Sequence, residues 1–236
     1  MATLLDPTAR GRVILVGAGP GDPGLLTVRA VEALQQADVV VHDGLIDPRV
    51  LDIAPPHAHR ISVAKQRDRH TLPQEGINAL IIAHVRLGQR VVRLKGGDPF
   101  IFGRGGEEVE AVREAGLPVE VIPGVSAALG CAAEAMLPLT HRDWSSAVSF
   151  VAGQCKGLKD QDWSGLAGKG RTLVIYMGVA TCTEIADKLM ADGVTPDMPV
   201  AVLEKGTLAG HRALRTLLAD ADDRLGKLAR QAELMA

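Results

Sequence analysis

Residues 16–27 read VGAGPGDPGLLT, and this stretch decides the fold class because it joins an apolar run to a helical pattern. Its glycines are similar to those of a dinucleotide-binding loop, but Asp22 stands where that fingerprint has Gly or Ala. Pro20 and Pro23 lack the backbone N–H donors that a pyrophosphate would need. We therefore expect this loop either to contact a neutral or cationic ligand or to be a plain strand-to-helix turn.

Apolar strand-like runs alternate with helical periodicity along the rest of the chain. The predicted strands are residues 12–16, 39–41, 90–94, 119–122, 147–152, 171–176 and 199–203, and the predicted helices are 24–36, 74–87, 106–115, 125–136 and 181–192. Repeated β-α units of this kind form a mostly parallel sheet, so the fold class is α/β. The pattern changes after Pro123, where small apolar residues suggest a buried helix. We place the boundary between two α/β domains there, as residues 1–125 and 126–236.

The composition bounds the class of protein. With 236 residues, 47% of them hydrophobic, the chain can form one large domain or two of ordinary size. Its apolar runs are shorter than the ~20 residues of a membrane span, and its start has no signal-peptide pattern. The cysteines, Cys131, Cys155 and Cys182, are too far apart for a zinc motif or a disulfide framework, which fits a cytoplasmic protein without a metal. The net charge of −2 and the 3% of aromatic residues argue against nucleic-acid binding.

A basic segment, residues 57–71 (HAHRISVAKQRDRHT), stands out in this slightly acidic chain. It is either a solvated loop or a site that attracts a polyanionic ligand, since clustered cations can steer an anion. His57 and His59 could bind a metal, but no carboxylate or thiol completes a ligand set, so we expect no metal site there.

A second glycine-rich stretch, residues 93–108, reads RLKGGDPFIFGRGGEE. The adjacent glycines Gly96 and Gly97 let the backbone approach a ligand closely. Asp98 precedes a proline and is therefore kept out of the helical region, which leaves its carboxylate free to bind a ligand. The following helix carries Glu107 and Glu108 in its first turn, and we expect both to be simple partners of the helix dipole.

Several motifs together resemble a known family. They are GAGPGDPGLLT (17–27), RLKGGDPFIFGRGGEE (93–108), PGVSAA (123–128), PLTHRD (138–143), VIYMG (174–178) and EKGT (204–207). In this order and spacing they are similar to the uroporphyrinogen-III C-methyltransferases of the tetrapyrrole methylase superfamily, over residues 12–210. The resemblance implies two α/β domains with S-adenosyl-L-methionine in the cleft between them, no metal, and a homodimer.

The resemblance also implies the cofactor contacts. Carried over position by position, they are Pro20, Gly96, Gly97, Asp98, Ile101, Ser126, Ala127, Met177 and Gly206. Ser126 keeps the hydroxyl of the Thr that is common in the family. Met177 would otherwise be interpreted as a core residue, the usual role of methionine.

Two residues are implied as proton carriers: Asp43, in VVVHDGLI, as acceptor and Lys65, in SVAKQRDRH, as donor. An electron-rich pyrrole carbon is already a nucleophile, so in-line placement supplies much of the acceleration. A proton must still leave the macrocycle, and a carboxylate can take it. Asp43 is alternatively a turn residue, and Lys65 alternatively binds a substrate carboxylate.

The substrate that the resemblance implies, uroporphyrinogen III, carries carboxylates around its ring, so arginines are the expected contacts. Arg67 and Arg69 in the basic segment, and Arg104 and Arg142 in the family motifs, are candidates for bidentate carboxylate recognition. His70 and His141 could assist.

The chain departs from the family pattern at several positions. His42 replaces the usual Tyr, Gln66 replaces an Arg, and Gly76 replaces a Glu. Relatives continue into a further apolar strand, whereas residues 211–236 read as a polar, helix-like tail. We therefore expect the C-terminal domain to lack its terminal strand.

The sequence thus predicts a cytoplasmic methyltransferase that converts uroporphyrinogen III to precorrin-2 through precorrin-1, in siroheme or cobalamin biosynthesis. A methylase of a later corrin precursor and an inactive cofactor-binding homologue are the alternatives. A nucleotide-dependent oxidoreductase is disfavoured by the two prolines of the first loop.

Overall fold

The computed structural model describes residues 11–64, 72–154, 162–221 and 223–224. The chain divides into two compact units. The first comprises Met1–Cys131 with Gly206–Ala209, and the second comprises Ala132–Lys205 with Gly210–Ala236. The domain boundary expected at residue 125 stays a prediction beside this division. No helix in the described ranges is long and apolar enough to cross a bilayer.

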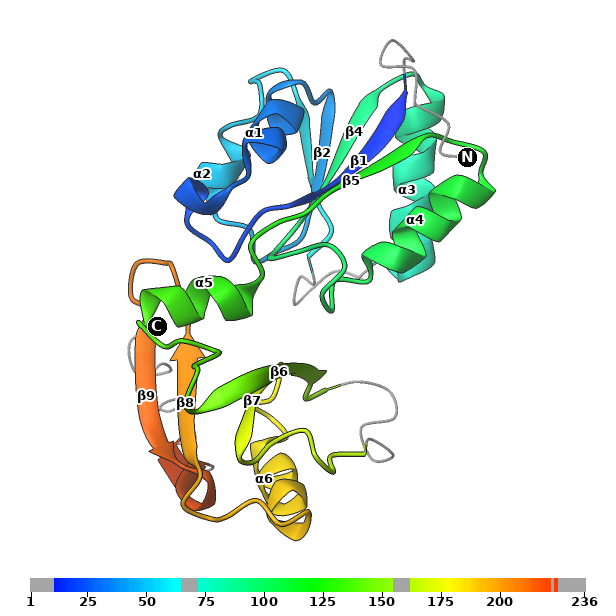
Figure 1. Cartoon of the computed structure of the whole chain (residues 1–236). Helices are drawn as coiled ribbons and strands as arrows, with labels where there is room; N and C mark the ends of the chain where they lie inside the picture. Colours follow the sequence, from blue (N-terminus) through cyan, green and yellow to red (C-terminus); the bar gives the residue numbers. More distant parts are fainter. Residues whose placement is uncertain (1–10, 65–71, 155–161, 222, 225–236) are drawn as a thin grey trace. The chain divides into compact units, whose positions relative to one another are not determined.

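The first unit is built on a five-stranded parallel sheet with the order β3-β2-β4-β1-β5 (Figure 1). Along the chain its elements are β1 (Arg12–Gly17), η1 (Pro23–Leu25), α1 (Val28–Gln35), β2 (Val39–His42), α2 (Pro48–Leu51), β3 (His59–Ser62), α3 (Gln74–Arg86), β4 (Arg90–Lys95), α4 (Gly105–Glu114) and β5 (Val119–Ile122). The division between the two units falls within the next helix, α5 (Ala127–Glu134). The predicted parallel α/β sheet is confirmed.

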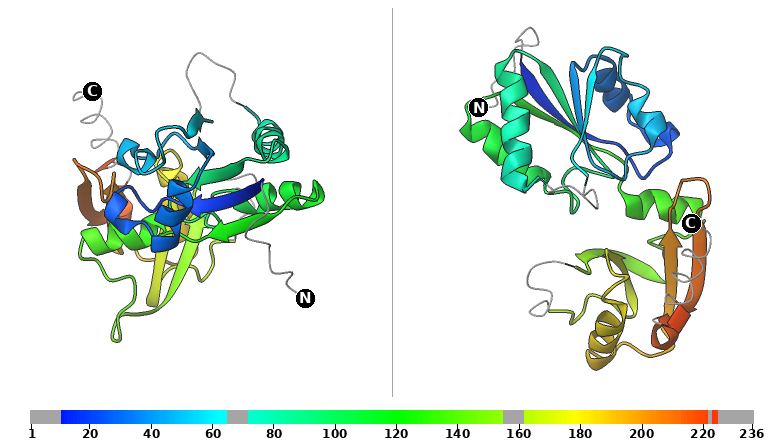
Figure 2. Two further views of the ribbon diagram at one scale, coloured as in Figure 1. Left: turned by 90° about the horizontal axis from the view of Figure 1, so that it is seen from above. Right: turned by 180° about the vertical axis from the view of Figure 1, so that it is seen from behind.

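Helices cover both faces of this sheet, with α1 and α2 on one face and α3 and α4 on the other (Figure 2). Successive residues of a strand point to opposite faces, and β1 shows this directly. Ile14 packs in the cluster that contains Leu34 of α1, while Val13 packs in the cluster that contains Ile81 of α3 and Val112 of α4. A sheet covered on both faces requires strands that are apolar throughout, and this explains the nearly continuous apolar runs in the sequence.

The sheet has a topological switch point between β1 and β4. These strands are neighbours, paired from Arg12↔Arg90 to Gly17↔Lys95. The chain leaves β1 toward α1 on one face and leaves β4 toward α4 on the opposite face. Open α/β sheets bind ligands outside the carboxyl ends of their strands at such a point. Both glycine-rich stretches follow these two strands, so the topology brings them to one edge.

The second unit contains two small sheets. Its elements are β6 (Ser145–Ala152) and β7 (Gly170–Tyr176), which pair in parallel, α6 (Cys182–Ala191), and β8 (Pro199–Glu204) and β9 (Arg212–Leu217), which pair antiparallel, followed by η3 (Leu218–Asp220). Its core includes Val151, Trp163, Ile185 and Leu189.

Several elements differ from the sequence expectations, and the short helix α2 is one that was not predicted. The strand β9 contradicts a tail without β structure: Leu214 and Leu217 fit a helical spacing, but burial alternates with period two along Arg212–Leu217. The edge strand β3 was missed because it is mostly polar and exposed. The helix α5 forms where predicted but is not fully buried, since Leu129 is 52% exposed.

Candidate functional site

The loops after β1 and β4 are joined directly at the carboxyl edge of the sheet. The Gly97 amide donates to the Gly19 carbonyl (2.8 Å), and the Gly19 amide donates to the Gly97 carbonyl (3.2 Å). Both residues have positive φ, 71° and 68°, which glycine adopts without strain. The two glycine-rich stretches therefore form one structural unit.

Two kinds of glycine occur at this edge. Gly17 and Gly124 allow close backbone packing, because a Cβ on Gly17 would lie 2.6 Å from the Cα of Gly124. Gly96 is different: its φ is not positive, and an added Cβ would have no described atom within 4 Å. The fold itself gives no reason for glycine at position 96, which is what a position kept open for a ligand would show.

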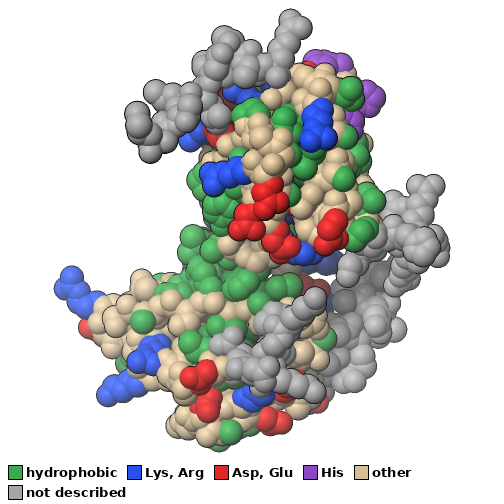
Figure 3. Space-filling view, turned by 90° about the vertical axis from the view of Figure 1, so that its right-hand side faces the viewer, with side chains coloured by type: hydrophobic (Ala, Val, Ile, Leu, Met, Phe, Trp, Pro, Cys, Tyr) green, Lys and Arg blue, Asp and Glu red, His purple; other side chains and the backbone are tan. Residues whose placement is uncertain are grey.

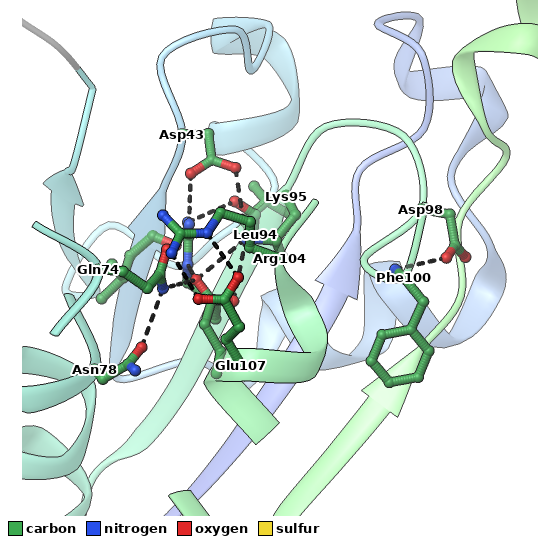
Figure 4. A network of polar contacts seen from close by, with 12 residues as sticks. Asp43, Gln74, Asn78, Leu94, Lys95, Asp98, Phe100, Arg104 and Glu107 are labelled. Carbon is green, nitrogen blue, oxygen red and sulfur yellow. Dashed lines mark hydrogen bonds and ion pairs between the residues drawn. The ribbon is translucent and has the colours of Figure 1, made fainter. Parts of the chain in front are cut away.

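Asp98 organises the neighbouring loops. Its Oδ1 accepts a hydrogen bond from the Phe100 amide (2.9 Å), and its Oδ2 accepts one from the Gly124 amide (3.0 Å; Figure 4 shows the Phe100 contact). The expectation of a free carboxylate is therefore wrong. Asp98 thus ties its own turn, before α4, to Gly124, which follows β5.

The first turn of α5 gathers most of the remaining cofactor candidates. A Cβ added to Gly97 would lie 3.5 Å from the Ala127 amide nitrogen, and one added to Gly130 would lie 3.0 Å from Cβ of Pro20. Ser126, 6% exposed, precedes this turn. The residues that the first unit brings to this edge are Pro20, Gly96, Gly97, Asp98, Ile101, Ser126, Ala127 and Gly206, the last packed against Cys131 of α5.

Two candidates belong to the second unit. Met177 is 52% exposed with a φ of 55°, so the interpretation of this residue as core packing is wrong. A non-glycine residue at positive φ costs ~1–3 kcal/mol, and such residues cluster at functional positions. Arg142 is exposed in the turn that His141 and Ser145 close with mutual backbone hydrogen bonds.

Lys65, Arg67, Arg69 and His70 lie outside the described residues, so their roles stay predictions. Among the residues that are described, no group of three or more His, Cys, Asp or Glu side chains is arranged to hold a metal ion.

Arg104 is already paired within its own helix turn. Its Nε and Nη2 donate to the two Glu107 oxygens, at 2.8 and 2.6 Å, and these hydrogen bonds raise the pKa of Arg104. Both side chains are about half exposed. A substrate carboxylate would therefore have to compete with Glu107 for the guanidinium.

Asp43 lies at the carboxyl end of β2 and contacts two cations of β4. Its Oδ1 is 2.5 Å from Arg93 Nη2, and its Oδ2 is 3.9 Å from Lys95 Nζ. Figure 4 shows this carboxylate above the polar network. The Asp43 side chain is 37% exposed, whereas that of Arg93 is 2% exposed. One carboxylate thus lies between solvent and a buried charge cluster.

Glu108 lies inside the protein, and the expectation that it only complements the helix dipole is wrong. Its Oε1 accepts hydrogen bonds from Arg93 Nε (2.9 Å), Lys95 Nζ (3.2 Å) and Gln74 Nε2 (3.2 Å). By contrast, Glu107, Glu110 and Glu114 of the same helix are exposed, and Figure 3 shows acidic side chains gathered on this side of the first unit.

The sequence did contain a signal for this buried cluster. Arg93 and Lys95 are cations two residues apart in a strand that is covered on both faces, and such charges require buried partners. Burial lowers the pKa of Lys95, and the neighbouring Arg93 lowers it further, while Glu108 and Asp43 oppose this.

Comparison with known proteins gives consistent results. The family model "Tetrapyrrole (Corrin/Porphyrin) Methylases" matches residues 12–222. A siroheme synthase of Gluconacetobacter diazotrophicus is 52% identical over 212 residues, which are 89% of this chain and 45% of that protein. The chain therefore spans about half the length of the curated relatives it matches.

Solved structures agree with these sequence matches. The native uroporphyrin III C-methyl transferase from Thermus thermophilus is 39% identical, with a TM-score of 0.75, covering 91% of this chain and 87% of that one. A second structure from that organism, 38% identical with the same coverage and TM-score, is complexed with S-adenyl homocysteine. The matches cover nearly all of the described elements, and the chain belongs to the tetrapyrrole (corrin/porphyrin) methylase family.

Proposed function

We propose that this chain transfers methyl groups from S-adenosyl-L-methionine to uroporphyrinogen III in two successive steps, giving precorrin-2 through precorrin-1. The observation that carries the proposal is the pair of loops joined at Gly19 and Gly97, at the switch point of the sheet. These loops occur in a chain 39% identical to a uroporphyrin III C-methyl transferase. The similarity to siroheme synthases supports siroheme, beside cobalamin-type tetrapyrroles, as the destination of the product.

The joined loops suit this cofactor better than a nucleotide. Pro20 and Pro23 offer no N–H to a pyrophosphate, and Gly96 leaves the backbone open on one side. When bound, the cofactor supplies an electrophilic methyl group on a sulfonium cation and is released as S-adenosyl-L-homocysteine. The residues proposed to hold it are Pro20, Gly96, Gly97, Asp98, Ile101, Ser126, Ala127 and Gly206 of the first unit and Met177 of the second.

Asp43 is the proposed proton acceptor. Attack by the pyrrole carbon leaves a surplus proton on the macrocycle, and a positioned carboxylate can remove it. The 37% exposure of Asp43 leaves the carboxylate accessible while Arg93 holds one of its oxygens. Lys65 is the proposed proton donor, with binding of a substrate carboxylate as its alternative role.

The arginines Arg67, Arg69, Arg104 and Arg142 are proposed to bind the substrate carboxylates. For Arg104 this requires that a substrate carboxylate replace Glu107, whose geometry is already bidentate. A homodimer, a cytoplasmic location and a domain division at residues 125 and 126 are further parts of the proposal.

Incubation of the chain with uroporphyrinogen III and methyl-labelled S-adenosyl-L-methionine tests this function. Mass analysis should find two added methyl groups, with a singly methylated species at early times. A product with no added methyl group would refute the proposal, and a product that stops at one would refute the second step. Calorimetry with NAD(P) is the matched control and should detect no binding.

A further inference from the structure

The guanidinium of Arg93 is held on all sides at the carboxyl edge of the sheet. Its Nη2 contacts Asp43, its Nε donates to Glu108, and its Nη1 donates to the carbonyls of Val41 (3.4 Å) and Leu94 (3.3 Å). The planar fork of an arginine can serve two carboxylates at fixed angles, which the point charge of a lysine cannot. Arg93 therefore has one orientation, and its ion pair with Asp43 fixes the direction of that carboxylate.

Glu108 fixes the position of Arg93 by accepting a hydrogen bond from its Nε. It is fully buried and belongs to α4, and Gln74 of α3 donates to it while also donating to Asn78 (3.1 Å; Figure 4). Two helices on one face of the sheet thus support a carboxylate whose strongest partner is Arg93. Glu108 does not contact Asp43 itself but is linked to it by two cations. One is Arg93, and the other is Lys95, whose Nζ lies 3.1 Å from Glu108 Oε2.

The charged groups facing Asp43 are balanced. Arg93 and Lys95 come from β4 and Glu108 from α4, and the ring Nδ1 of His42 on β2 lies 3.0 Å from the Asp43 carbonyl oxygen. Two full cations therefore face two carboxylates. When Asp43 accepts a proton, this balance changes next to the buried pair of Arg93 and Glu108, so this pair influences how well the carboxylate performs that step.

We infer that Arg93, held by Glu108, is a positioning residue that fixes the Asp43 carboxylate for proton acceptance, and that Lys95 balances the charge of this carboxylate. This inference rests on the proposed function. Nothing in this role requires Arg93 or Glu108 to touch the substrate. Their contribution should appear in turnover and disappear when Asp43 is removed.

The test uses Glu108→Gln, which keeps the shape and one acceptor oxygen but removes the charge. We expect kcat for methylation of uroporphyrinogen III to fall about tenfold to hundredfold, as for a slightly misplaced catalytic group. KM for that substrate and Kd for S-adenosylhomocysteine should stay within about twofold of the wild-type values, because Glu108 does not contact either ligand in this proposal. In an Asp43→Asn background, Glu108→Gln should have little further effect, because coupled residues are not additive.

A spectroscopic readout makes the inference independent of turnover. In ¹³C-aspartate-labelled protein without substrate, the Asp43 carboxylate resonance, assigned by its loss in Asp43→Asn, should move in Glu108→Gln. Asp38→Asn is the matched control, since Asp38 pairs with Arg90 at the amino ends of the same two strands, and it should move neither kcat nor this resonance.

Three results would overturn the inference: an unmoved Asp43 resonance, additive losses in the double variant, or an equal effect of Asp38→Asn. Should Glu108→Gln fail to fold, Gln74→Leu is the second variant, because it removes only the hydrogen bonds that the neutral Gln74 amide donates to Glu108 and Asn78. It should move the resonance and kcat in the same direction, by less, and an unchanged resonance and kcat there would equally overturn the inference. If the wild-type chain does not methylate uroporphyrinogen III, the proposed function fails while the resonance still tests the link from Glu108 to Asp43.

Discussion

The two edges of the first unit's sheet carry arginine–carboxylate pairs in opposite surroundings. At the amino edge, Arg90 and Asp38 are 42% and 36% exposed and lie 3.7 Å apart. At the carboxyl edge, Arg93 is 2% exposed and pairs with both Asp43 and Glu108. Both arginines belong to β4, so the strand is the same and only burial and partners differ.

The difference in burial between the two pairs separates charges that only keep the surface soluble from charges that we expect to have a function. An exposed ion pair contributes ~0–1 kcal/mol to stability. A buried pair gains little over an apolar core, yet losing one partner costs ~3–5 kcal/mol. The charges at the carboxyl edge are thus poorly explained by stability, and they lie at the carboxyl ends of β2 and β4, next to the switch point where α/β sheets bind ligands. The four predictions below test whether the edges differ in this way.

The largest effect is expected for Asp43→Asn. Loss of the proposed proton acceptor should reduce single-turnover methylation by about 10²–10⁴-fold, the usual contribution of general base catalysis. The affinity for S-adenosylhomocysteine should stay near the wild-type value. Single-turnover rates with labelled methyl groups, measured across the pH range, check this, and a rate equal to wild type at every pH would exclude a proton role.

Arg93→Met should destabilise the fold by ~3–5 kcal/mol, because Glu108 is left buried with Lys95 as its remaining cation. Denaturant unfolding measures the loss. The double variant Arg93→Met/Glu108→Met is the control, since it removes one cation and one carboxylate and leaves Lys95 with Asp43. It should recover part of the lost stability, and a double variant less stable than the single one would contradict the charge-balance argument.

Much of this edge could be predicted from sequence because its signals are local. Apolar runs that break at Gly or Pro locate β1, β4 and β5 and the loops that follow them, and the motifs in residues 16–27 and 93–108 pointed to a family whose membership is confirmed. That these two stretches hold a ligand stays a prediction. Non-local contacts were not predictable in the same way. Nothing within residues 105–108 tells that Glu108 faces Arg93, which is fifteen residues earlier in another element.

The roles of hydrogen-bond acceptors also escaped local reasoning. Asp98 before Pro99 was correctly recognised as a non-helical turn residue, but its partners are amides of Phe100 and Gly124. The second of these depends on where β5 ends in space. In the second unit, β9 was hidden because Leu214, Leu217 and Leu218 satisfy a helical spacing as well as a strand.

A smaller effect is expected for Gly96→Ala. The new Cβ contacts no described atom and the backbone φ is not positive, so stability should stay within ~0.5 kcal/mol of wild type. If the open side of Gly96 receives the cofactor, Kd for S-adenosylhomocysteine should rise at least about tenfold, or ~1.4 kcal/mol. Gly97→Ala should instead lower the stability of the fold by ~1–2 kcal/mol, because Gly97 has a positive φ of 68°. Unchanged affinity in Gly96→Ala would remove this position from the site.

The smallest effect is expected at the amino edge, and it decides whether the comparison holds. Asp38→Asn removes the charge from an exposed pair but keeps a side-chain oxygen. This oxygen can still accept the hydrogen bond that the Arg90 backbone amide donates to Asp38 Oδ2 in the wild type, at 2.8 Å. The substitution should cost ~0–1 kcal/mol of stability. Because ~1 kcal/mol shifts the melting temperature of a domain of this size by about 2–4 °C, a shift of only a few degrees is expected.

Added salt should reduce the difference in melting temperature between Asp38→Asn and wild type, since exposed charges are screened. The cost of Arg93→Met should persist at high salt. Melting curves of both variants at low and high salt measure this directly. Equal salt dependence at the two edges would mean that Arg93 is hydrated like Arg90, and the contrast between the edges would then be lost.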